Sequence, residues 1–108
     1  MALAMDRHFF ASERTRLGYT QDRFAAVLDV NVYTIKKWEG GSRKIPAEMG
    51  YVLIALANGL EPVGVDFLVP LPRVTGYIIA AIQAELKPAG VEFISEIPKG
   101  SKADKSED

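Results

Sequence analysis

The sequence has no cysteine and only one histidine and one tryptophan in 108 residues. The absence of cysteine excludes disulfides, thiol catalysis and thiolate metal sites, and it suits a reducing compartment. His8 has no neighbouring carboxylate cluster, so it is more typical of a surface residue than of a metal ligand or general base. We find no metal-ligand spacing, no Ser/His/acid set and no phosphate-binding glycine loop. We therefore expect neither an enzyme nor a bound cofactor or metal.

Long hydrophobic runs and a strong net charge are also missing. No apolar run reaches the ~18 residues of a membrane span, and the start "MALAMDRHFF" lacks a signal-peptide pattern. We expect a cytoplasmic protein with no membrane partner. The net charge is −1, but residues 1–58 carry eight basic and six acidic residues, and residues 59–108 carry five and eight. Within 31–44, "NVYTIKKWEGGSRK", four basic residues face one acidic residue, which indicates a local basic patch.

Four helices are predicted in the first sixty residues. The first covers about residues 6–17, the second follows Thr20 as a cap, and the third covers about 32–39 after Asn31. A fourth begins with Pro46 in its first turn and ends at Gly59. The apolar spacing predicts these core positions: Phe9, Phe10, Leu17, Phe24, Ala25, Leu28, Ile35, Trp38, Met49, Leu53, Leu56 and Ala57.

The second and third helices are joined by the short sequence "DVN". Ala25 is small enough to let the two helices cross closely, and Asp29 tolerates the left-handed backbone of a tight turn better than most residues. Two short helices arranged in this way form a helix-turn-helix unit.

The second half of the chain combines a helix with strand-like segments. Apolar spacing predicts a helix over about 73–86, terminated by Pro88. The pentads "GVDFL" (64–68) and "GVEFI" (90–94) alternate like strands, and the second continues to Ile97. The two could pair across the helix, or 91–97 could be a lone strand that pairs with another chain, or 64–68 could be a short helix. The tail 99–108 is predicted to be disordered.

The segment "RTRLGYTQDRFAAVLDVNVYTIKKWEGGSRKIP" resembles the helix-turn-helix domain of phage repressor and Cro-type proteins, the XRE family. Asp29 departs from the family pattern, where Gly is usual, and so does Glu13, where an apolar residue is common. The matching positions are Arg14, Gly18, Thr20, Gln21, Phe24, Ala25, Val30, Ile35, Trp38, Glu39, Gly41 and Pro46.

The resemblance implies a mostly α fold: a lambda-repressor-like helix-turn-helix bundle of four to five helices with a small C-terminal helix-plus-strand extension. The DNA-binding domain would cover 1–60, a dimerisation extension 61–98, and the tail 99–108. The implied function is sequence-specific binding of double-stranded DNA by a homodimeric transcriptional regulator, which we expect to be a repressor.

The resemblance also implies site residues, with helix 31–39 in the major groove. Lys37 is the best candidate for guanine and Val32 for a thymine methyl group. The base-reading candidates are Val32, Tyr33, Lys36 and Lys37. The phosphate candidates are Thr20, Gln21, Arg43 and Lys44. Arg14 and Glu39 match a structural ion pair. On an isolated helix the two lysines would be only a solvated face, and Ile35 and Trp38 are core rather than a stacking platform.

The stretch "IAAIQAELKPAGVEFI" resembles a C-terminal segment of small bacterial regulators of this family. If its strand has no partner within the chain, antiparallel pairing about a two-fold axis would form the dimer. The dimerisation candidates are Val91, Phe93, Ile94 and Ile97. The alternative function is an antitoxin-like or adaptor protein whose C-terminal half, through 91–97, binds a partner such as a toxin.

Overall fold

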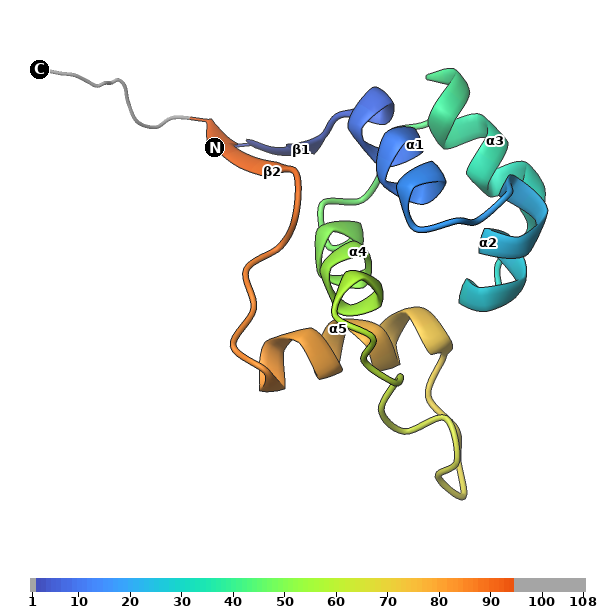
Figure 1. The fold of residues 1–108 in the computed structure, drawn as a ribbon, viewed down its shortest axis with the longest axis vertical. Coiled ribbons are helices and arrows are strands. Elements are labelled where there is room, and N and C mark those ends of the chain that lie inside the picture. Colours follow the sequence, from blue (N-terminus) through green and yellow to red (C-terminus); the bar gives the residue numbers. More distant parts are fainter. Residues whose placement is uncertain (1, 95–108) are drawn as a thin grey trace, which may run out of the picture.

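A computed structural model describes residues 2–94 of the chain and the side chains of residues 5–90. Figure 1 shows a mostly helical fold in which the first three helices lie together at one end and α4 and α5 pack below them. The elements in chain order are β1 (Ala2–Met5), α1 (Arg7–Arg16), α2 (Gln21–Leu28), α3 (Val32–Gly40), α4 (Met49–Ala57), α5 (Arg73–Gln83) and β2 (Val91–Ile94).

The second and third helices begin directly after the predicted caps Thr20 and Asn31, and the first begins after Asp6, which the predicted range 6–17 had included in the helix. The Asp6 carboxylate accepts a hydrogen bond from the Phe9 N–H at 2.8 Å, and the Thr20 hydroxyl accepts one from the Arg23 N–H at 3.1 Å. Asn31 does the same for Tyr33 at 2.8 Å. Each side chain satisfies an N–H group that a helix start leaves unpaired.

The fourth helix begins three residues later than Pro46 suggested. The backbone carbonyls of Pro46 and Ala47 accept hydrogen bonds from the N–H groups of Met49 and Gly50, both at 3.0 Å, in the three-residue spacing of a tighter turn.

The buried face of α4 also differs from the prediction. Met49 and Leu53 are buried as expected, but Leu56 is only half-buried and Ala57 is exposed. Val52 and Ala55 are buried instead.

The fifth helix ends before the predicted Leu86, and Pro88 does not terminate it. Glu85 has a left-handed backbone with φ of 59°. This turn directs the Leu86 N–H to the Ala81 carbonyl at 3.0 Å and the Glu85 N–H to the Ile82 carbonyl at 2.9 Å. The helix therefore stops by hydrogen bonds within its own last turn.

One core joins all five helices. The ring of Phe10 lies edge-on to Phe24 and Trp38, with ring centroids 5.6 and 5.7 Å apart. Such pairs add about 0.5–1.5 kcal/mol beyond the burial of their apolar area. Tyr77 and Ala81 of α5 belong to the same buried cluster, 4% and 0% exposed. The predicted core residues Phe9 and Leu17 pack at its edge and are only partly buried.

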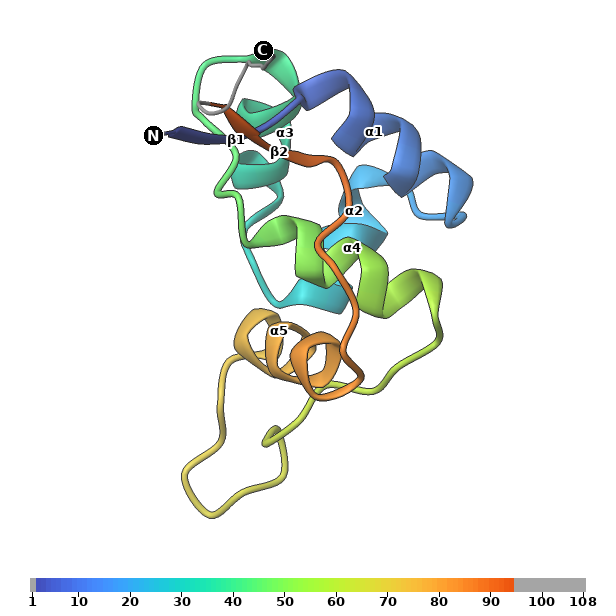
Figure 2. The same ribbon diagram turned by 90° about the vertical axis from the view of Figure 1, so that its left-hand side faces the viewer.

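The C-terminal strand pairs with the N-terminal one, an arrangement that the sequence did not indicate. β2 runs antiparallel to β1, with Ala2 opposite Ile94 and Met5 opposite Val91 (Figure 2). Of the alternatives for this strand, residues 91–94 pair within the chain, but with β1 and not with residues 64–68. Residues 64–68 form turns and bends, so they are neither the predicted strand nor a short helix. Ile97 and the tail 99–108 lie outside the described residues.

Candidate nucleic-acid interface

The geometry of the α2–α3 unit depends on a tight left-handed turn. Asp29 has φ of 56° and ψ of 48°, as its tolerance for this conformation predicted. The Val30 N–H reaches back to the Ala25 carbonyl at 3.0 Å and closes α2. Ala25 is 4% exposed. The turn fixes the direction in which α3 leaves α2.

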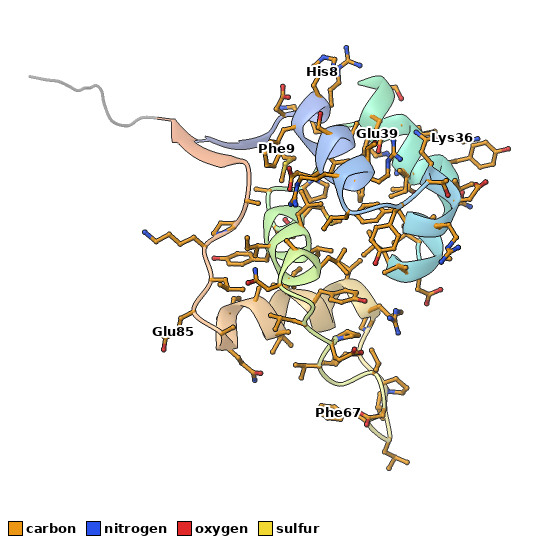
Figure 3. All side chains as sticks on the ribbon, viewed as in Figure 1. His8, Phe9, Lys36, Glu39, Phe67 and Glu85 are labelled. Carbon is orange, nitrogen blue, oxygen red and sulfur yellow. The ribbon has the colours of Figure 1, made fainter. Side chains whose placement is uncertain are left out.

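One side of α3 lies in the core and the other lies in solvent. Ile35 and Trp38 are 0% and 7% exposed, as predicted, whereas Tyr33 is 64% exposed. Lys36 and Lys37 are exposed beside it. The Lys36 ammonium lies 5.4 Å from the centre of the Tyr33 ring, a cation–π distance. Figure 3 shows Lys36 projecting away from the molecule.

Val32 differs from the other base-reading candidates. Its side chain is partly buried and packs against the core, so only part of it is available to a partner. Tyr33, Lys36 and Lys37 are the candidates that α3 presents to solvent.

The loop after α3 places two phosphate candidates next to this surface. The Lys37 carbonyl accepts hydrogen bonds from the N–H groups of Ser42 and Arg43, at 3.1 and 3.3 Å. The side chains of Arg43 and Lys44 are exposed, and the buried Ile45 anchors the end of the loop. The two cations therefore extend the positive surface of α3 beyond its C-terminal end.

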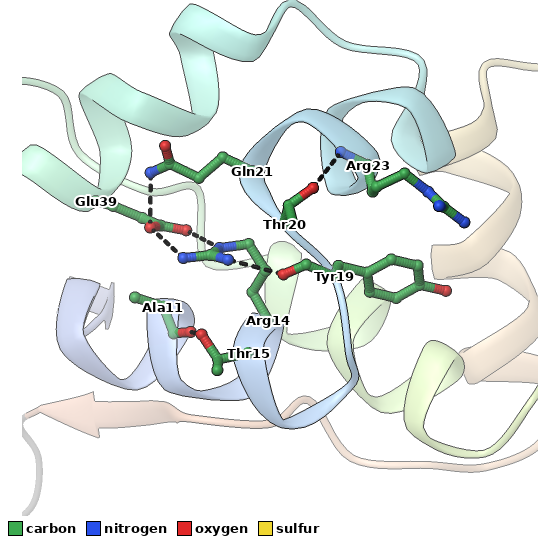
Figure 4. A network of polar contacts seen from close by, with 8 residues as sticks. All are labelled: Ala11, Arg14, Thr15, Tyr19, Thr20, Gln21, Arg23 and Glu39. Carbon is green, nitrogen blue, oxygen red and sulfur yellow. Dashed lines mark hydrogen bonds and ion pairs between the residues drawn. The ribbon is translucent and has the colours of Figure 1, made fainter.

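The start of α2 carries the other two phosphate candidates, which have different surroundings. The Thr20 hydroxyl accepts from a helix N–H, which leaves its own hydrogen available for an acceptor outside the chain. The Gln21 amide instead donates to Glu39 Oε1 at 3.0 Å, so Gln21 is directed toward α3 (Figure 4). Asp22 adds an acidic side chain in the same helical turn.

Glu39 is the centre of a polar network beneath the candidate surface. Arg14 donates to its two carboxylate oxygens through Nε and Nη2, at 2.7 and 3.0 Å. Arg14 also donates to the Tyr19 carbonyl at 2.8 Å. The Arg14 and Glu39 side chains are 14% and 9% exposed. A two-pronged ion pair of this kind joins α1 to the end of α3 and neutralises the acidic residue nearest to the lysines.

Arg7 makes a contact with α3 that no feature of the sequence predicted. Its Nη1 donates to the Glu39 backbone carbonyl at 3.0 Å, 32 positions along the chain. A side chain at Gly41 would meet the Arg7 guanidinium, because a Cβ there would lie 3.3 Å from Arg7 Cζ. Arg7 is also exposed, so its charge adds to the positive surface at the C-terminal end of α3. An isolated arginine at a helix start gives no sequence signal for such a contact.

Glu13 on α1 is paired with a neighbouring arginine. Glu13 accepts from Arg16 at 2.6 and 3.1 Å, and this hydrogen bond lowers the pKa of the Glu13 carboxyl below its usual value. Glu13, one of the two residues that depart from the XRE pattern, is thus held by its neighbour on the same helix. Among residues 2–94 there is no group of three or more His, Asp or Glu side chains that could hold a metal ion.

The dimerisation candidates Val91, Phe93 and Ile94 belong to β2, whose backbone is paired with β1 along these residues. Ile97 is not among the described residues.

No helix in the described part of the chain is both long enough and apolar enough to cross a membrane. Comparison with protein families, curated proteins and solved structures gave no match to this chain.

Proposed function

We propose that this protein is a sequence-specific DNA-binding transcriptional regulator that inserts α3 into the major groove of double-stranded DNA. The observation that supports it is the two-sided character of α3. Ile35 and Trp38 fix one side in the core. Tyr33, Lys36 and Lys37 stand in solvent on the other, and neither lysine has an ion-pair partner within the described residues. A major groove admits one helix whose projecting side chains reach the base edges.

Within this proposal, the exposed residues divide into base-reading and phosphate-binding groups. Lys37 donates to guanine O6 and N7, and Tyr33 and Lys36 contact neighbouring bases or the backbone. Val32, being partly buried, offers only part of its surface to a thymine methyl group. Arg43, Lys44 and the Thr20 hydroxyl bind phosphates, which fixes the position of α3 without reading sequence.

Gln21 takes a different role from the other phosphate candidates. Because its amide already donates to Glu39, we assign it to holding the start of α2 against the end of α3. The remaining amide hydrogen can still meet a phosphate there.

A single unit of this size contacts few base pairs, so the proposal includes two copies of the chain on one operator. Two half-sites centred ~34 Å apart, or a multiple of that distance, would each receive one α3. Binding as a pair raises affinity without new contacts, because the second site is met at a high local concentration. We expect the outcome to be repression, through occupation of the operator.

The test begins with selection of the duplexes that the protein binds. The pool contains random sequences together with fragments of the DNA upstream of the gene that encodes this protein. The selected site is then compared with a scrambled duplex by fluorescence anisotropy across a salt series. We expect tight binding of the selected site and a linear fall of the logarithm of the binding constant with the logarithm of salt, about 0.9 per phosphate contact.

Two variants separate reading from positioning. Lys37→Ala should reduce the preference for the selected site by roughly 5- to 150-fold, since a bidentate base contact discriminates by ~1–3 kcal/mol. Arg43→Ala should weaken both duplexes alike and lower the salt slope by about one. Lys87→Ala, an exposed lysine beyond α5, is the matched control and should change neither. Failure to enrich any sequence, or equal weak binding of the most enriched duplex and its scrambled version, would refute the proposal.

A further inference from the structure

Arg7 belongs to α1, but its guanidinium lies at the C-terminal end of α3. Its Nη1 donates to the Glu39 carbonyl at 3.0 Å. The guanidinium also lies close to Gly41, where a Cβ would come within 3.3 Å of Arg7 Cζ and Nε. The start of α1 accordingly lies beside the end of α3 (Figure 1). A cation from the first turn of α1 is therefore part of the surface around the loop that follows α3.

The absence of a side chain at Gly41 makes this approach possible. Gly41 has φ of +87°, the left-handed backbone that ends α3. An alanine there would strain the backbone, and its methyl group would press on the guanidinium. The residue that ends α3 thus also leaves the space that the guanidinium occupies.

Most of the hydrogen-bonding capacity of Arg7 remains free. A guanidinium has five N–H donors, and the bond to Glu39 is the one that Arg7 makes among the described residues. No carboxylate in the described part of the chain lies within 4.0 Å of it. Arg7 is exposed, so a positive charge with unused donors faces solvent at this point.

The bond to Glu39 does not by itself account for the position of Arg7. That bond is exposed to solvent, where water can replace the guanidinium on the carbonyl, so it contributes little to the free energy of unfolding. The end of α3 is already attached to α1 by the ion pair between Arg14 and Glu39. Arg7 is therefore available to a partner.

Two further cations lie close to Arg7 on a separate segment. Arg43 and Lys44 follow Gly41 by two and three residues. Consecutive Cα atoms are about 3.8 Å apart, so the backbones of these two residues lie within about 12 Å of Gly41. The acidic residue next to Arg7 is Asp6, whose carboxylate caps α1. Three cations from two segments thus gather at the end of α3.

We propose that Arg7 is a phosphate-binding residue of the DNA interface. This inference rests on the proposed function and adds to it a contact from outside the α2–α3 unit. In the proposed complex the first half of α3 reads base edges, so its C-terminal end and the following loop lie at a phosphate strand that borders the groove. The free N–H groups of Arg7 bind a phosphate there as a fork.

The contact positions α3 without reading sequence. One guanidinium holds both the Glu39 carbonyl and the phosphate, so it fixes the end of α3 relative to the DNA backbone. Its contribution is electrostatic and equal for all base sequences. The loss of Arg7 should therefore change the salt dependence of binding and leave the preference between duplexes unchanged.

Fluorescence anisotropy of the full chain on the selected duplex and its scrambled version, across a salt series, tests the proposal. Arg7→Ala should lower the salt slope by about 0.9 and weaken both duplexes roughly fivefold at ~0.15 M salt, when the slope is referred to ~1 M salt. Arg7→Lys keeps the positive charge and should keep the slope. Both variants should keep the circular dichroism and melting temperature of the wild type, because the bond to Glu39 is exposed.

Arg16→Ala is the matched control. It removes the same charge from the same helix, but Arg16 lies nine residues after Arg7, on the opposite side of α1 at 3.6 residues per turn. Arg16 is also paired with Glu13. Arg16→Ala should leave the salt slope unchanged, which separates a phosphate contact from a change in net charge.

Selected duplexes that carry a single neutral methylphosphonate locate the contact. One such replacement should weaken the wild type roughly fivefold at ~0.15 M salt and leave Arg7→Ala unaffected, because that contact is already lost. Wild-type salt slope in Arg7→Ala, with wild-type sensitivity to every methylphosphonate, overturns this inference alone. A wild type that selects no duplex refutes the proposed function and this inference with it.

Discussion

At Asp29 the backbone has φ of 56°, a conformation that costs a non-glycine residue roughly 1–2 kcal/mol. The carboxylate also lies at the C-terminal end of α2, where the helix dipole disfavours negative charge. Both effects destabilise the folded state at the turn between α2 and α3. The chain keeps an acidic side chain there without any hydrogen bond of that side chain among the described residues.

We expect Asp29→Gly to raise the free energy of unfolding by about 0.5–1 kcal/mol, since glycine removes the backbone strain but loses more entropy on folding. Asp29→Asn, which removes only the charge, should give a smaller gain. Urea denaturation measures both. Ala26→Gly, at an exposed position within α2, is the control and should lower stability by about 1 kcal/mol. A loss of stability in Asp29→Gly would mean that the carboxylate has a stabilising role.

Single residues were predictable from sequence where their partners are close along the chain. The predicted caps Thr20 and Asn31 accept hydrogen bonds from N–H groups three and two positions ahead, so local residue types determine them. Arg7 and Arg73 bond to backbone carbonyls 32 and 46 positions away. A carbonyl gives no residue-type signal, and neither contact could be read from the sequence.

Between elements, Arg73 attaches the start of α5 to the end of α2. Its Nε donates to the Val27 carbonyl at 2.6 Å, and its Nη2 donates to the Tyr77 hydroxyl at 3.2 Å. The guanidinium also lies 5.7 Å from the centre of the Tyr77 ring. Because Val27 is in the last turn of α2, the positive charge meets the negative end of the helix dipole.

Arg73→Ala should lower the free energy of unfolding by about 1–3 kcal/mol, because it removes a charged hydrogen bond and leaves a partly buried carbonyl without its partner. Arg73→Lys should recover little of the loss, since an ammonium cannot reproduce the fork that reaches both acceptors. Urea denaturation gives the values. Arg23→Ala, an exposed arginine on α2, is the control. Equal effects of the Arg73 and Arg23 substitutions to Ala would show that the contact does not attach α5.

The ends of helices were predicted less well than their existence. Prolines suggested a start at Pro46 and a stop before Pro88, but α4 begins at Met49 and α5 ends at Gln83. In both places short-range hydrogen bonds form a turn between the proline and the helix. A proline limits where a helix can extend, but it does not require the helix to reach it.

Over the whole molecule, the two halves of the sequence are less separate than composition suggested. The pairing of β2 with β1 joins the start of the chain to residue 94. The Ala89 N–H donates to the Gly50 carbonyl at 3.0 Å, and Tyr77 and Ala81 complete the core that α1 to α4 begin. Pairing of distant segments depends on the three-dimensional path, so hydrophobic spacing alone could not predict it.

From this shared core we predict how a chain that ends after Gly59 unfolds. Such a chain would lack Tyr77 and Ala81 of α5, which belong to the same buried cluster as Val52, Leu53 and Ala55 of α4. Loss of this packing corresponds to several kcal/mol of lost burial, comparable to the ~5–15 kcal/mol that stabilises an ordinary domain. Residues 1–59 alone should therefore lack a cooperative transition in urea, monitored by circular dichroism, whereas residues 1–94 should keep a single one.

The same experiment decides how DNA binding by truncated chains should be interpreted. If residues 1–59 unfold, loss of DNA binding in that fragment reports on the core and not on a dimer contact, so interface residues must be tested by point substitutions in the full chain. A cooperative transition in the fragment would instead make the first four helices an independent domain. In that case α5 would stabilise the protein only by adding to a core that is already sufficient.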